Sequence, residues 1–363
     1  MSVKSNLLLL LLLPVWAFAH QGDSEFKRTV TKEFTVNNKA NFTVSNKYGK
    51  IIVHTWPKNR IKATVIITGF GKNNSEAQEI ANGVDIQSNA DAGNVTMQTN
   101  YSASGGSKWF PWGSNRKDSK DYVNIDYELY VPSSLELLTL ENNFGDVITD
   151  ALPFAAKMRL NYCFYAIREA AKTLELDMNY CSKGKIDKAG NLIIKANYSD
   201  IRCDEATSMD VKSNYSDYTL GSLGSLVAKS NYSDYKIRQL GSIETNSNYS
   251  DFNVTNLSES TDLRLVYGDF KAKEVAVGYK GGKVDLTYSD LKLPISPKTA
   301  LRIMVNLNNG DLEIDGLPVK NVMSIKKNTS LSYTATTASG NDQSPQLTIN
   351  GKQSDVDLEA HDN

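Results

Sequence analysis

The sequence contains few of the residues that most often carry catalysis or metal binding. Its 363 residues include three histidines, His20, His54 and His361, and three cysteines. Their positions match no zinc site, nucleophilic triad or nucleotide-binding loop. The formal net charge of −1 gives no reason to expect nucleic acid or an anionic membrane surface as a partner. We therefore predict no catalytic residue, no cofactor and no enzymatic activity.

Long apolar runs are also missing, apart from one at the N-terminus. Residues 1–19 contain Lys4, a leucine-rich run from Leu7 to Leu13 and then Ala17-Phe18-Ala19. A basic start, a short apolar core and an Ala-x-Ala site predict a secretory signal peptide at 1–19. No later run is long enough for a transmembrane segment. We expect export to the periplasm, the cell surface or the extracellular medium, and these destinations stay open.

What the sequence does contain is one short motif repeated at a fixed spacing. Asn-Tyr-Ser-Asp occurs four times between residues 197 and 251, and its tyrosines are 17 residues apart. The pattern continues backward to Phe144 at spacings of 18, and forward through Tyr267 and Tyr288 to Asn309 at spacings of 18 to 21. Self-similarity at such a short period is typical of a stacked repeat architecture.

Apolar residues alternate on both sides of each motif, as they do in half-buried strands. Residues two, four and six before the tyrosine, and three and five after it, are apolar or small, while Ser, Gly and Asp mark a corner between two strands. An antiparallel hairpin array would also alternate, but identical corners at constant spacing fit better if each copy stacks on the one before. The predicted fold class is all-β: a single-stranded right-handed parallel β-helix, or solenoid, with coils of about 17–21 residues stacked about 4.8 Å apart.

The same template appears near both ends of the chain, so we predict one elongated unit rather than two domains. Residues 20–135 hold a first coil around Tyr48 and an inserted β-rich cap, which covers the exposed edge of the solenoid. A short helix is predicted near 75–82 and a frayed segment at 20–35. Residues 136–318 form the solenoid repeats. Residues 319–363 form a hairpin, a final coil around Ser354-Asp355 and a loose tail.

These features together are similar to a known family. The signal peptide, the opening coil at Asn46-Lys47-Tyr48-Gly49-Lys50, the short helix and the ladder of Tyr/Phe/Asn-Ser/Gly-Asp corners resemble the bacterial exported β-strand-repeat family of unknown function labelled "putative adhesin". The resemblance covers nearly all of the chain after residue 19, and the density of Asn-Tyr-Ser-Asp motifs resembles that of Bacteroidetes-type copies. It implies an architecture and export, and it supplies no catalytic residues.

The motif tyrosines would stack in register as an aromatic ladder at the corners of the coils. Because they share parity with the apolar positions, we predict that they point inward and fix the register, each pair adding about 0.5–1.5 kcal/mol. The alternative is an exposed aromatic strip that binds sugar rings. The ladder consists of Tyr162, Tyr180, Tyr198, Tyr215, Tyr232, Tyr249, Tyr267 and Tyr288.

An aspartate lies two residues after each ladder residue. Stacked carboxylates repel by about 1 kcal/mol per neighbouring pair in water. Hydrogen bonds to corner amides, nearby lysines, or calcium between successive carboxylates would offset that repulsion. We favour the amides, because the glycine-rich nonapeptide of calcium-binding solenoids is missing. The aspartate ladder consists of Asp146, Asp200, Asp217, Asp234, Asp251, Asp269, Asp290 and Asp311.

Two of the three cysteines fall at the same place in adjacent coils. Cys163 and Cys181 each follow a ladder tyrosine, so their Cα atoms should lie about 4.8 Å apart, within the disulfide range of about 4.4–6.8 Å. An exported protein permits the bond, although directly stacked neighbours strain its torsion, and both redox states stay open. Cys203 falls on an inward position and is expected to be a small buried hydrophobe.

Bulky aromatic residues in a polar, glycine-rich stretch make Trp109, Phe110 and Trp112 candidate binding residues, either as an exposed tip or as a plug for the end of the solenoid. The leading functional hypothesis is a non-enzymatic, adhesin-like binding or structural protein of the bacterial cell envelope. The alternatives are a periplasmic scaffold or signalling component, and a polysaccharide-cleaving β-helix enzyme with paired carboxylates about 5–9 Å apart. We expect an unidentified protein or glycan partner, and end-to-end self-association of the rods is a further alternative.

Overall fold

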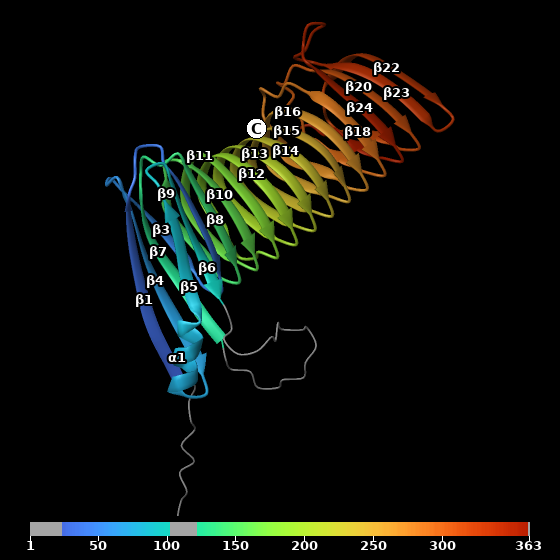
Figure 1. Cartoon of the computed structure of the whole chain (residues 1–363). Helices are drawn as coiled ribbons and strands as arrows, with labels where there is room; N and C mark the ends of the chain where they lie inside the picture. The colour runs from blue at the N-terminus through green and yellow to red at the C-terminus, as the bar shows by residue number, and fades with distance from the viewer. Residues whose placement is uncertain (1–23, 102–121, 362–363) are drawn as a thin grey trace, which may run out of the picture.

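The computed structural model describes residues 24–101 and 122–361, and it shows an elongated β-solenoid (Figure 1). The solenoid has about 9 turns of about 18 residues, which confirms the predicted fold class. Each central coil is one long bent strand that begins just after one corner and ends just before the next. These strands are β11 (Phe164–Asn179), β12 (Lys185–Asn197), β13 (Asp200–Asn214), β14 (Asp217–Asn231), β15 (Asp234–Asn248) and β16 (Phe252–Val266).

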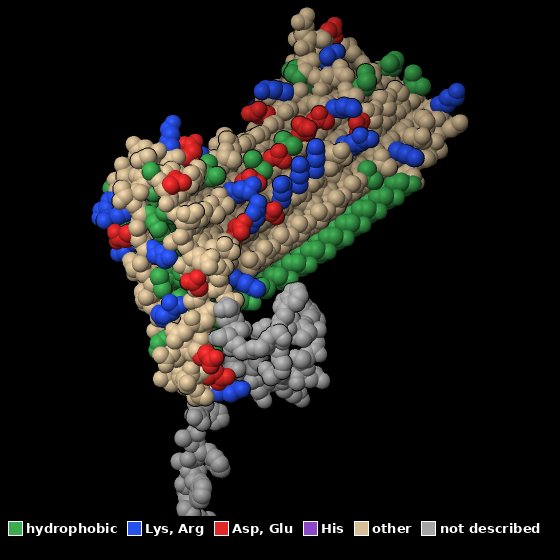
Figure 2. Space-filling model, viewed as in Figure 1, with side chains coloured by type: hydrophobic (Ala, Val, Ile, Leu, Met, Phe, Trp, Pro, Cys, Tyr) green, Lys and Arg blue, Asp and Glu red, His purple; other side chains and the backbone are tan. Residues whose placement is uncertain are grey.

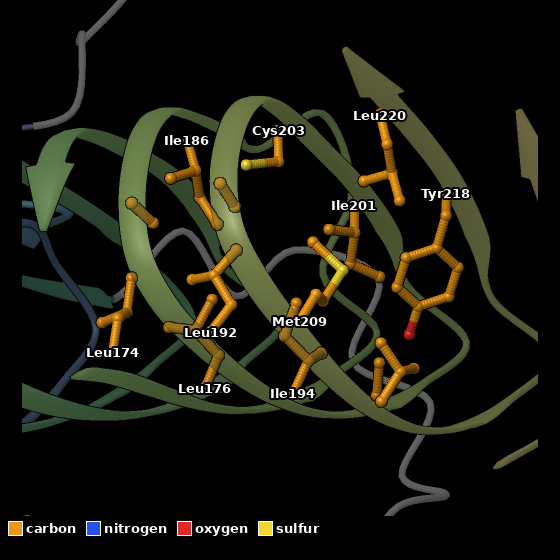
Figure 3. Packing of buried hydrophobic residues seen from close by; sticks show 14 of the residues in the cluster. Leu174, Leu176, Ile186, Leu192, Ile194, Ile201, Cys203, Met209, Tyr218 and Leu220 are labelled. Carbon is orange, nitrogen blue, oxygen red and sulfur yellow. The ribbon is translucent and has the colours of Figure 1, made fainter. Parts of the chain in front are cut away.

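Neighbouring coils pair in parallel and in register. Between β13 and β14, Asp200 pairs with Asp217 and Asn214 with Asn231, so residues at the same position of the repeat lie above one another. Each bent strand has two arms: the first follows the corner at which the strand begins, and the second leads to the next corner. The core lies between the two arms (Figure 3). The apolar positions that alternation predicts to face inward are buried, as shown by Met209, Val211, Ser213, Tyr218, Leu220 and Leu223.

The first coil, around Tyr48, comprises β2 (Asn41–Lys47) and β3 (Ile51–Trp56). It lies between the cap and the main run. On one side β2 pairs with β6 (Asn94–Tyr101) and β3 with β7 (Tyr122–Pro132), and on the other they pair with β8 (Leu137–Asn143) and β9 (Asp146–Leu152). Antiparallel strands then extend the cap: β7 pairs with β4 (Arg60–Gly71), β4 with β1 (Ser24–Thr35), and β6 with β5 (Val84–Ala90). The main run continues from β8 through β10 (Ala155–Asn161).

The predicted short helix is confirmed as α1 (Asn74–Asn82), which packs on the cap (Figure 1). The side chain of Asn73 caps it by accepting a hydrogen bond from the backbone N–H of Glu76 at 2.9 Å. The helix approaches β4 closely at Gly69, where an added Cβ would come within 2.1 Å of the Ala77 carbonyl oxygen. Within residues 24–101 and 122–361, no helix is long and apolar enough to span a membrane.

The prediction that residues 20–35 are frayed is wrong for their described part. Ser24–Thr35 forms β1, the outermost strand of the cap, and all 12 residues stay in antiparallel register with β4. The polar composition is misleading because only one face of this edge strand is covered. Phe26, Val30 and Phe34 pack against the core, while every second residue of the strand, from Glu25 to Thr35, is exposed.

The chain order of the coils changes at the C-terminal end. After β17 (Phe270–Val275), β18 (Gly282–Thr287) and β19 (Leu291–Lys292), the next strands in space are the last ones in the sequence. Thus β24 (Gln346–Lys352) pairs in parallel with both β18 and β20 (Arg302–Asn308), and β25 (Val356–Asp357) with both β19 and β21 (Leu312–Glu313). The prediction that the coil of Asn309 stacks directly on that of Tyr288 is therefore wrong.

A hairpin ends the sheet beyond β20, as the sequence predicts. It comprises β23 (Ser330–Thr337), which pairs with β20, and β22 (Val319–Lys327), which pairs with β23. The side chains of Val322, Met323 and Ile325 on β22 are 53–57% exposed. End-to-end association through this end of the rod remains a prediction.

Candidate functional site

The motif tyrosines form a ladder on the outside of the solenoid. The side chains of Phe144 and of the eight predicted ladder tyrosines are 43–53% exposed, and a continuous apolar strip follows one edge of the rod in Figure 2. The prediction that these tyrosines point inward is therefore wrong. We call this strip the tyrosine ladder; its rungs are Tyr48, Phe144, Tyr162, Tyr180, Tyr198, Tyr215, Tyr232, Tyr249, Tyr267 and Tyr288.

The outward direction follows from the backbone at the corner. All rungs have a positive φ between 50° and 65°, which is the left-handed region that favours glycine and asparagine. A left-handed residue interrupts the alternation of a strand. The tyrosine and the residue before it therefore both face outward, and the next residue, such as Ser216 after Tyr215, is buried. The prediction assigned side-chain directions by counting alternate residues from the apolar positions, and that count does not detect the interruption.

The rings are parallel and in contact from one coil to the next. Between Phe144 and Tyr288, successive ring centroids lie 4.7–5.1 Å apart and the ring planes differ by 1–8°. Tyr48 extends the stack, with its ring centroid 5.7 Å from that of Phe144. At a strand spacing of about 4.8 Å, the whole ladder is roughly 45 Å long.

The asparagine and serine of the motif hold the corner together. Asparagine side chains form their own ladder from Asn143 to Asn248, in which each amide donates to the side-chain oxygen of the preceding one at 2.7–3.1 Å. The motif serines are buried: the Oγ of Ser233, for example, accepts from the backbone N–H of Ser216 at 3.2 Å and donates to the carbonyl of Asn231 at 3.2 Å. The sequence-based interpretation missed both ladders, although the recurrence of Asn and Ser at a fixed spacing is the signal for them.

A second aromatic stack lies inside the solenoid, three residues after the corners. The rings of Tyr218, Tyr235 and Phe252 are buried and stack with centroid distances of 4.4 and 4.5 Å. Burial raises the pKa of the Tyr218 and Tyr235 hydroxyls. This inner stack lies in the core, where the motif tyrosines were predicted to lie, so the outer ladder is not needed to fill the interior.

The aspartate ladder runs beside the tyrosine ladder, on the arm after the corner. Near the C-terminal end its carboxylates accept hydrogen bonds from backbone N–H groups of the next coil: Asp251 from Asp269, and Asp269 from Asp290, each at 2.9 Å. Farther back, burial and then the charges of Asp251 and Asp217 raise the pKa of Asp234. In the described part of the chain, no group of three or more His, Cys, Asp or Glu side chains is placed to hold a metal ion.

Exposed lysines line the other side of the tyrosine ladder. Lys195, Lys212 and Lys229 lie three residues before successive rungs, and Lys212 pairs in register with both of the others. In Figure 2, basic and acidic side chains follow lines along the face beside the apolar strip. We call these three residues the lysine column. The edge of the rod is therefore an aromatic strip with carboxylates on one side and, on the other, amides followed by ammonium groups.

No protein-family model matches this chain, and no curated protein does. Several solved structures are similar to it. They include a putative cell adhesion protein from Clostridium sporogenes ATCC 15579 (9% identity, 93% of this chain and 100% of that chain covered, TM-score 0.20). Others are a putative adhesin from Bacteroides fragilis NCTC 9343 (10%, 91% and 97%, 0.27) and a putative lipid binding protein from Parabacteroides distasonis ATCC 8503 (11%, 74% and 92%, 0.34).

Two of these three structures carry an adhesion-related description. Identities and TM-scores this low transfer no binding property to this chain. Its function is therefore argued from the tyrosine ladder and the residues beside it.

The remaining candidate residues form no second site in the described chain. Cys163, Cys181 and Cys203 are free and buried, and burial raises the pKa of the Cys203 thiol to about 12. The thiols of Cys163 and Cys181 lie 3.2 and 3.3 Å from the backbone carbonyl oxygens of Asn142 and Leu160. Trp109, Phe110 and Trp112, like the predicted signal peptide, lie outside the described residues.

Proposed function

We propose that this chain is an exported, non-enzymatic, adhesin-like rod of the bacterial cell envelope, and that its binding surface is the tyrosine ladder. The observation that carries the proposal is the length of the exposed strip. Nine rungs are 43–53% exposed, and an aromatic side chain has about 150–250 Å² of surface, so the strip offers roughly 900 Å². Soluble monomers rarely expose a contiguous apolar patch larger than a few hundred Å².

The fold does not require tyrosine at these corners. A left-handed backbone costs an ordinary residue about 1–2 kcal/mol. Stacking on the next ring returns about 0.5–1.5 kcal/mol per pair beyond area burial, and the covered half of each ring, roughly 100 Å² at about 25 cal/mol per Å², returns about 2 kcal/mol more. Tyrosine therefore stabilises each corner, although about half of its ring remains exposed to solvent. The chain builds the same left-handed corner with Asn309 and Gln353, and asparagine tolerates this conformation better than tyrosine does. The repeated tyrosines thus support a role in binding.

The rod also holds its rungs at fixed spacing. Each coil is paired along both arms, and the asparagine and serine ladders tie successive corners together. A partner that contacts several rungs at once gains affinity without any new type of contact, because each further contact is intramolecular. Weak single contacts along a rigid strip suit an adhesive role.

The proposal is tested by replacing four central rungs, Tyr198, Tyr215, Tyr232 and Tyr249, with asparagine. Asparagine keeps the left-handed corner, as at Asn309, and removes the ring. We expect beads coated with the protein to bind the bacteria that produce it, and the four-rung variant to lose most of this binding. Its melting temperature should fall, because the ring area uncovered and the stacking lost outweigh the strain relieved, so binding is compared at a temperature at which both proteins are folded.

A matched control places asparagine elsewhere on the same coils. The control carries Glu205→Asn, Ser222→Asn and Gln239→Asn. These three positions pair in register with one another and with Asn256, on the arm after the corner and away from the ladder. This control should bind as the parent does. Equal bead binding by the four-rung variant and the control would refute the proposal.

The cellular location has its own test. Protease added to intact cells should digest the protein if it is displayed outside the cell. Protection until the outer membrane is permeabilised would contradict an adhesive role and would favour the alternative of a periplasmic scaffold.

A further inference from the structure

The tyrosine ladder offers ring edges to a partner, and its ring faces are already covered. From Phe144 to Tyr288 each ring lies against the next, with centroids 4.7–5.1 Å apart and planes within 8° of parallel. At the N-terminal end the ammonium of Lys47 lies 4.7 Å above the ring of Tyr48. At the other end the backbone N–H of Tyr288 bonds to the carbonyl of Lys352, so Gln353 occupies the next corner. Stacking of a sugar ring or another flat ligand on a ring face is therefore blocked along the ladder.

The spacing of the rungs is the second observation. A partner that meets every rung in the same way must repeat at the same distance, about 4.8 Å, which is the spacing of paired β-strands. A partner whose period differed by about one tenth would be half a rung out of register after roughly five rungs. A surface of stacked β-strands has the required period, and a second copy of this chain has it by identity. Two such stacks that meet in register can form a dry, tightly packed contact.

We propose that the partner of the tyrosine ladder is the tyrosine ladder of a second copy of this chain, so that two rods associate side by side. This inference rests on the proposed function, because it names the partner of the same binding surface. The available area fits: roughly 900 Å² per rod gives about 1,800 Å² for two rods if all of it is covered, and stable interfaces bury about 1,200–2,000 Å² in total.

The charges beside the ladder select the relative direction of the two rods. The aspartate ladder lies on one side of the rungs and the lysine column on the other. A two-fold axis along the rods keeps them parallel and places the lysine side of one copy opposite the aspartate side of the other. An axis across the rods makes them antiparallel and opposes like charges. The aspartates lie two residues after the rungs and the lysines three residues before them, beside the ring contact rather than within it, so both columns govern orientation more than strength.

The state of Asp234 agrees with this arrangement. Burial and then the neighbouring carboxylates of Asp251 and Asp217 raise its pKa in the single rod, against the charge of Lys236, which lowers it. A further cation opposite Asp234 would favour its charged form. Among the central rungs, no hydrogen bond from a lysine of the described chain to Asp217, Asp234 or Asp251 is present, in contrast to Asp269, which Lys271 contacts at 2.8 Å.

Sedimentation velocity of the exported chain is the first test. We expect the parent protein to show a species of twice the monomer mass as its concentration rises, and the four-rung asparagine variant to remain a monomer at the same concentrations. The Glu205→Asn, Ser222→Asn, Gln239→Asn control should behave as the parent does. A parent that stays monomeric at all concentrations, or a four-rung variant that still dimerises, overturns the proposal.

Single-cysteine rungs test the direction. In parallel rods every rung faces its own copy, so Tyr162→Cys alone should form a covalent dimer on mild oxidation. The three native cysteines are buried and should not compete while the protein is folded. In antiparallel rods with the nine exposed rungs in full register, Tyr162→Cys would form a covalent dimer only when mixed with Tyr267→Cys, and that result would overturn the parallel arrangement.

The two proposals fail in different ways. Loss of bead binding in the four-rung variant, together with a strictly monomeric parent, would refute side-by-side pairing and leave the adhesive function standing. A parent dimer that the four-rung variant abolishes, together with unchanged bead binding, would establish the pairing and refute adhesion through the ladder.

Discussion

Ser233 is the residue through which the buried serine ladder is best tested. Its side-chain oxygen accepts from the backbone N–H of Ser216 at 3.2 Å, donates to the carbonyl of Asn231 at 3.2 Å and lies 3.0 Å from the Oγ of Ser213. Ser233→Ala removes all three contacts and leaves the N–H of Ser216 buried without a partner. An unsatisfied buried donor costs about 1–3 kcal/mol, whereas the carbonyl of Asn231 keeps the N–H of Tyr215. We therefore expect a local loss of about 2 kcal/mol.

Amide hydrogen exchange of the corner peptide measures this loss where it arises. A cost of about 2 kcal/mol corresponds to roughly 30-fold faster exchange if exchange proceeds through opening of this corner. The control is Ser225→Ala on β14, where the side chain is only half-buried, and its effect should stay below about 0.5 kcal/mol. If Ser233→Ala exchanges no faster than Ser225→Ala, the serine hydroxyls do not support the corners and the reasoning is refuted.

Three further predictions follow from other parts of the structure. Gly268→Ala should destabilise the protein by about several kcal/mol, because its Cβ would lie 2.2 Å from the carbonyl oxygen of Ser250. The control Gly278→Ala has open space around the new Cβ and should unfold at the same urea concentration as the parent. Equal urea midpoints for Gly268→Ala and Gly278→Ala would contradict the close packing at Gly268. Asp234→Asn should raise the urea midpoint at pH 7 but not near pH 3. Burial and adjacent carboxylates raise the pKa of Asp234, so the native state holds this proton more tightly than the unfolded chain, and stability falls as pH rises from the unfolded value through the raised one. The gain in the free energy of unfolding should stay below about 1 kcal/mol because the Asp234 carboxyl is largely solvated. A stabilisation by Asp234→Asn that grew as the pH fell would contradict this pH dependence. All three cysteines are buried, so none should react with a thiol reagent in the folded protein. After unfolding in the absence of a reductant, all three should react, whereas a single reactive thiol would show that Cys163 and Cys181 are bridged.

The repeat period could be read from the sequence because one physical requirement fixes it. In-register parallel pairing places equivalent residues above one another, as with Asp200 and Asp217, so the spacing of Asn-Tyr-Ser-Asp is the length of a coil. The buried positions followed from alternation for the same reason. Where the backbone is extended, the repeat period and the alternation of apolar residues are sufficient to predict the coil length and the buried side chains.

The direction of the tyrosines could not be predicted, because it depends on one dihedral angle. Parity assumes an unbroken strand, and the left-handed φ of residues such as Tyr215 turns a side chain outward that counting places inward. Tyrosine is an uncommon choice for that conformation, so its identity gave no warning. The buried Ser216 beside it is the clue, since a small polar residue at an invariant place in each motif suits a crowded corner.

The insertion of β24 and β25 near the C-terminus could not be predicted either. The pattern around Ser354-Asp355 predicts a coil, but it does not predict which coil lies next to it. Every coil offers backbone N–H and carbonyl groups for parallel pairing at its edges, so a coil of this type can stack on any other. The pairing of Gly282 with Leu347 joins residues far apart in sequence. Which coils become neighbours is decided by the hairpin of β22 and β23, whose antiparallel contact with β20 occupies the outer edge.

The central claim is that the tyrosine ladder is a binding surface rather than a requirement of the fold. The most direct measurement compares bead binding and melting temperature in a series with one, two, three and four central rungs replaced by asparagine, starting at Tyr215. The account predicts that bead binding per folded molecule falls with each rung removed, while the melting temperature falls by about a few degrees per rung as ring area is uncovered. Bead binding that follows only the folded fraction of each variant would contradict it.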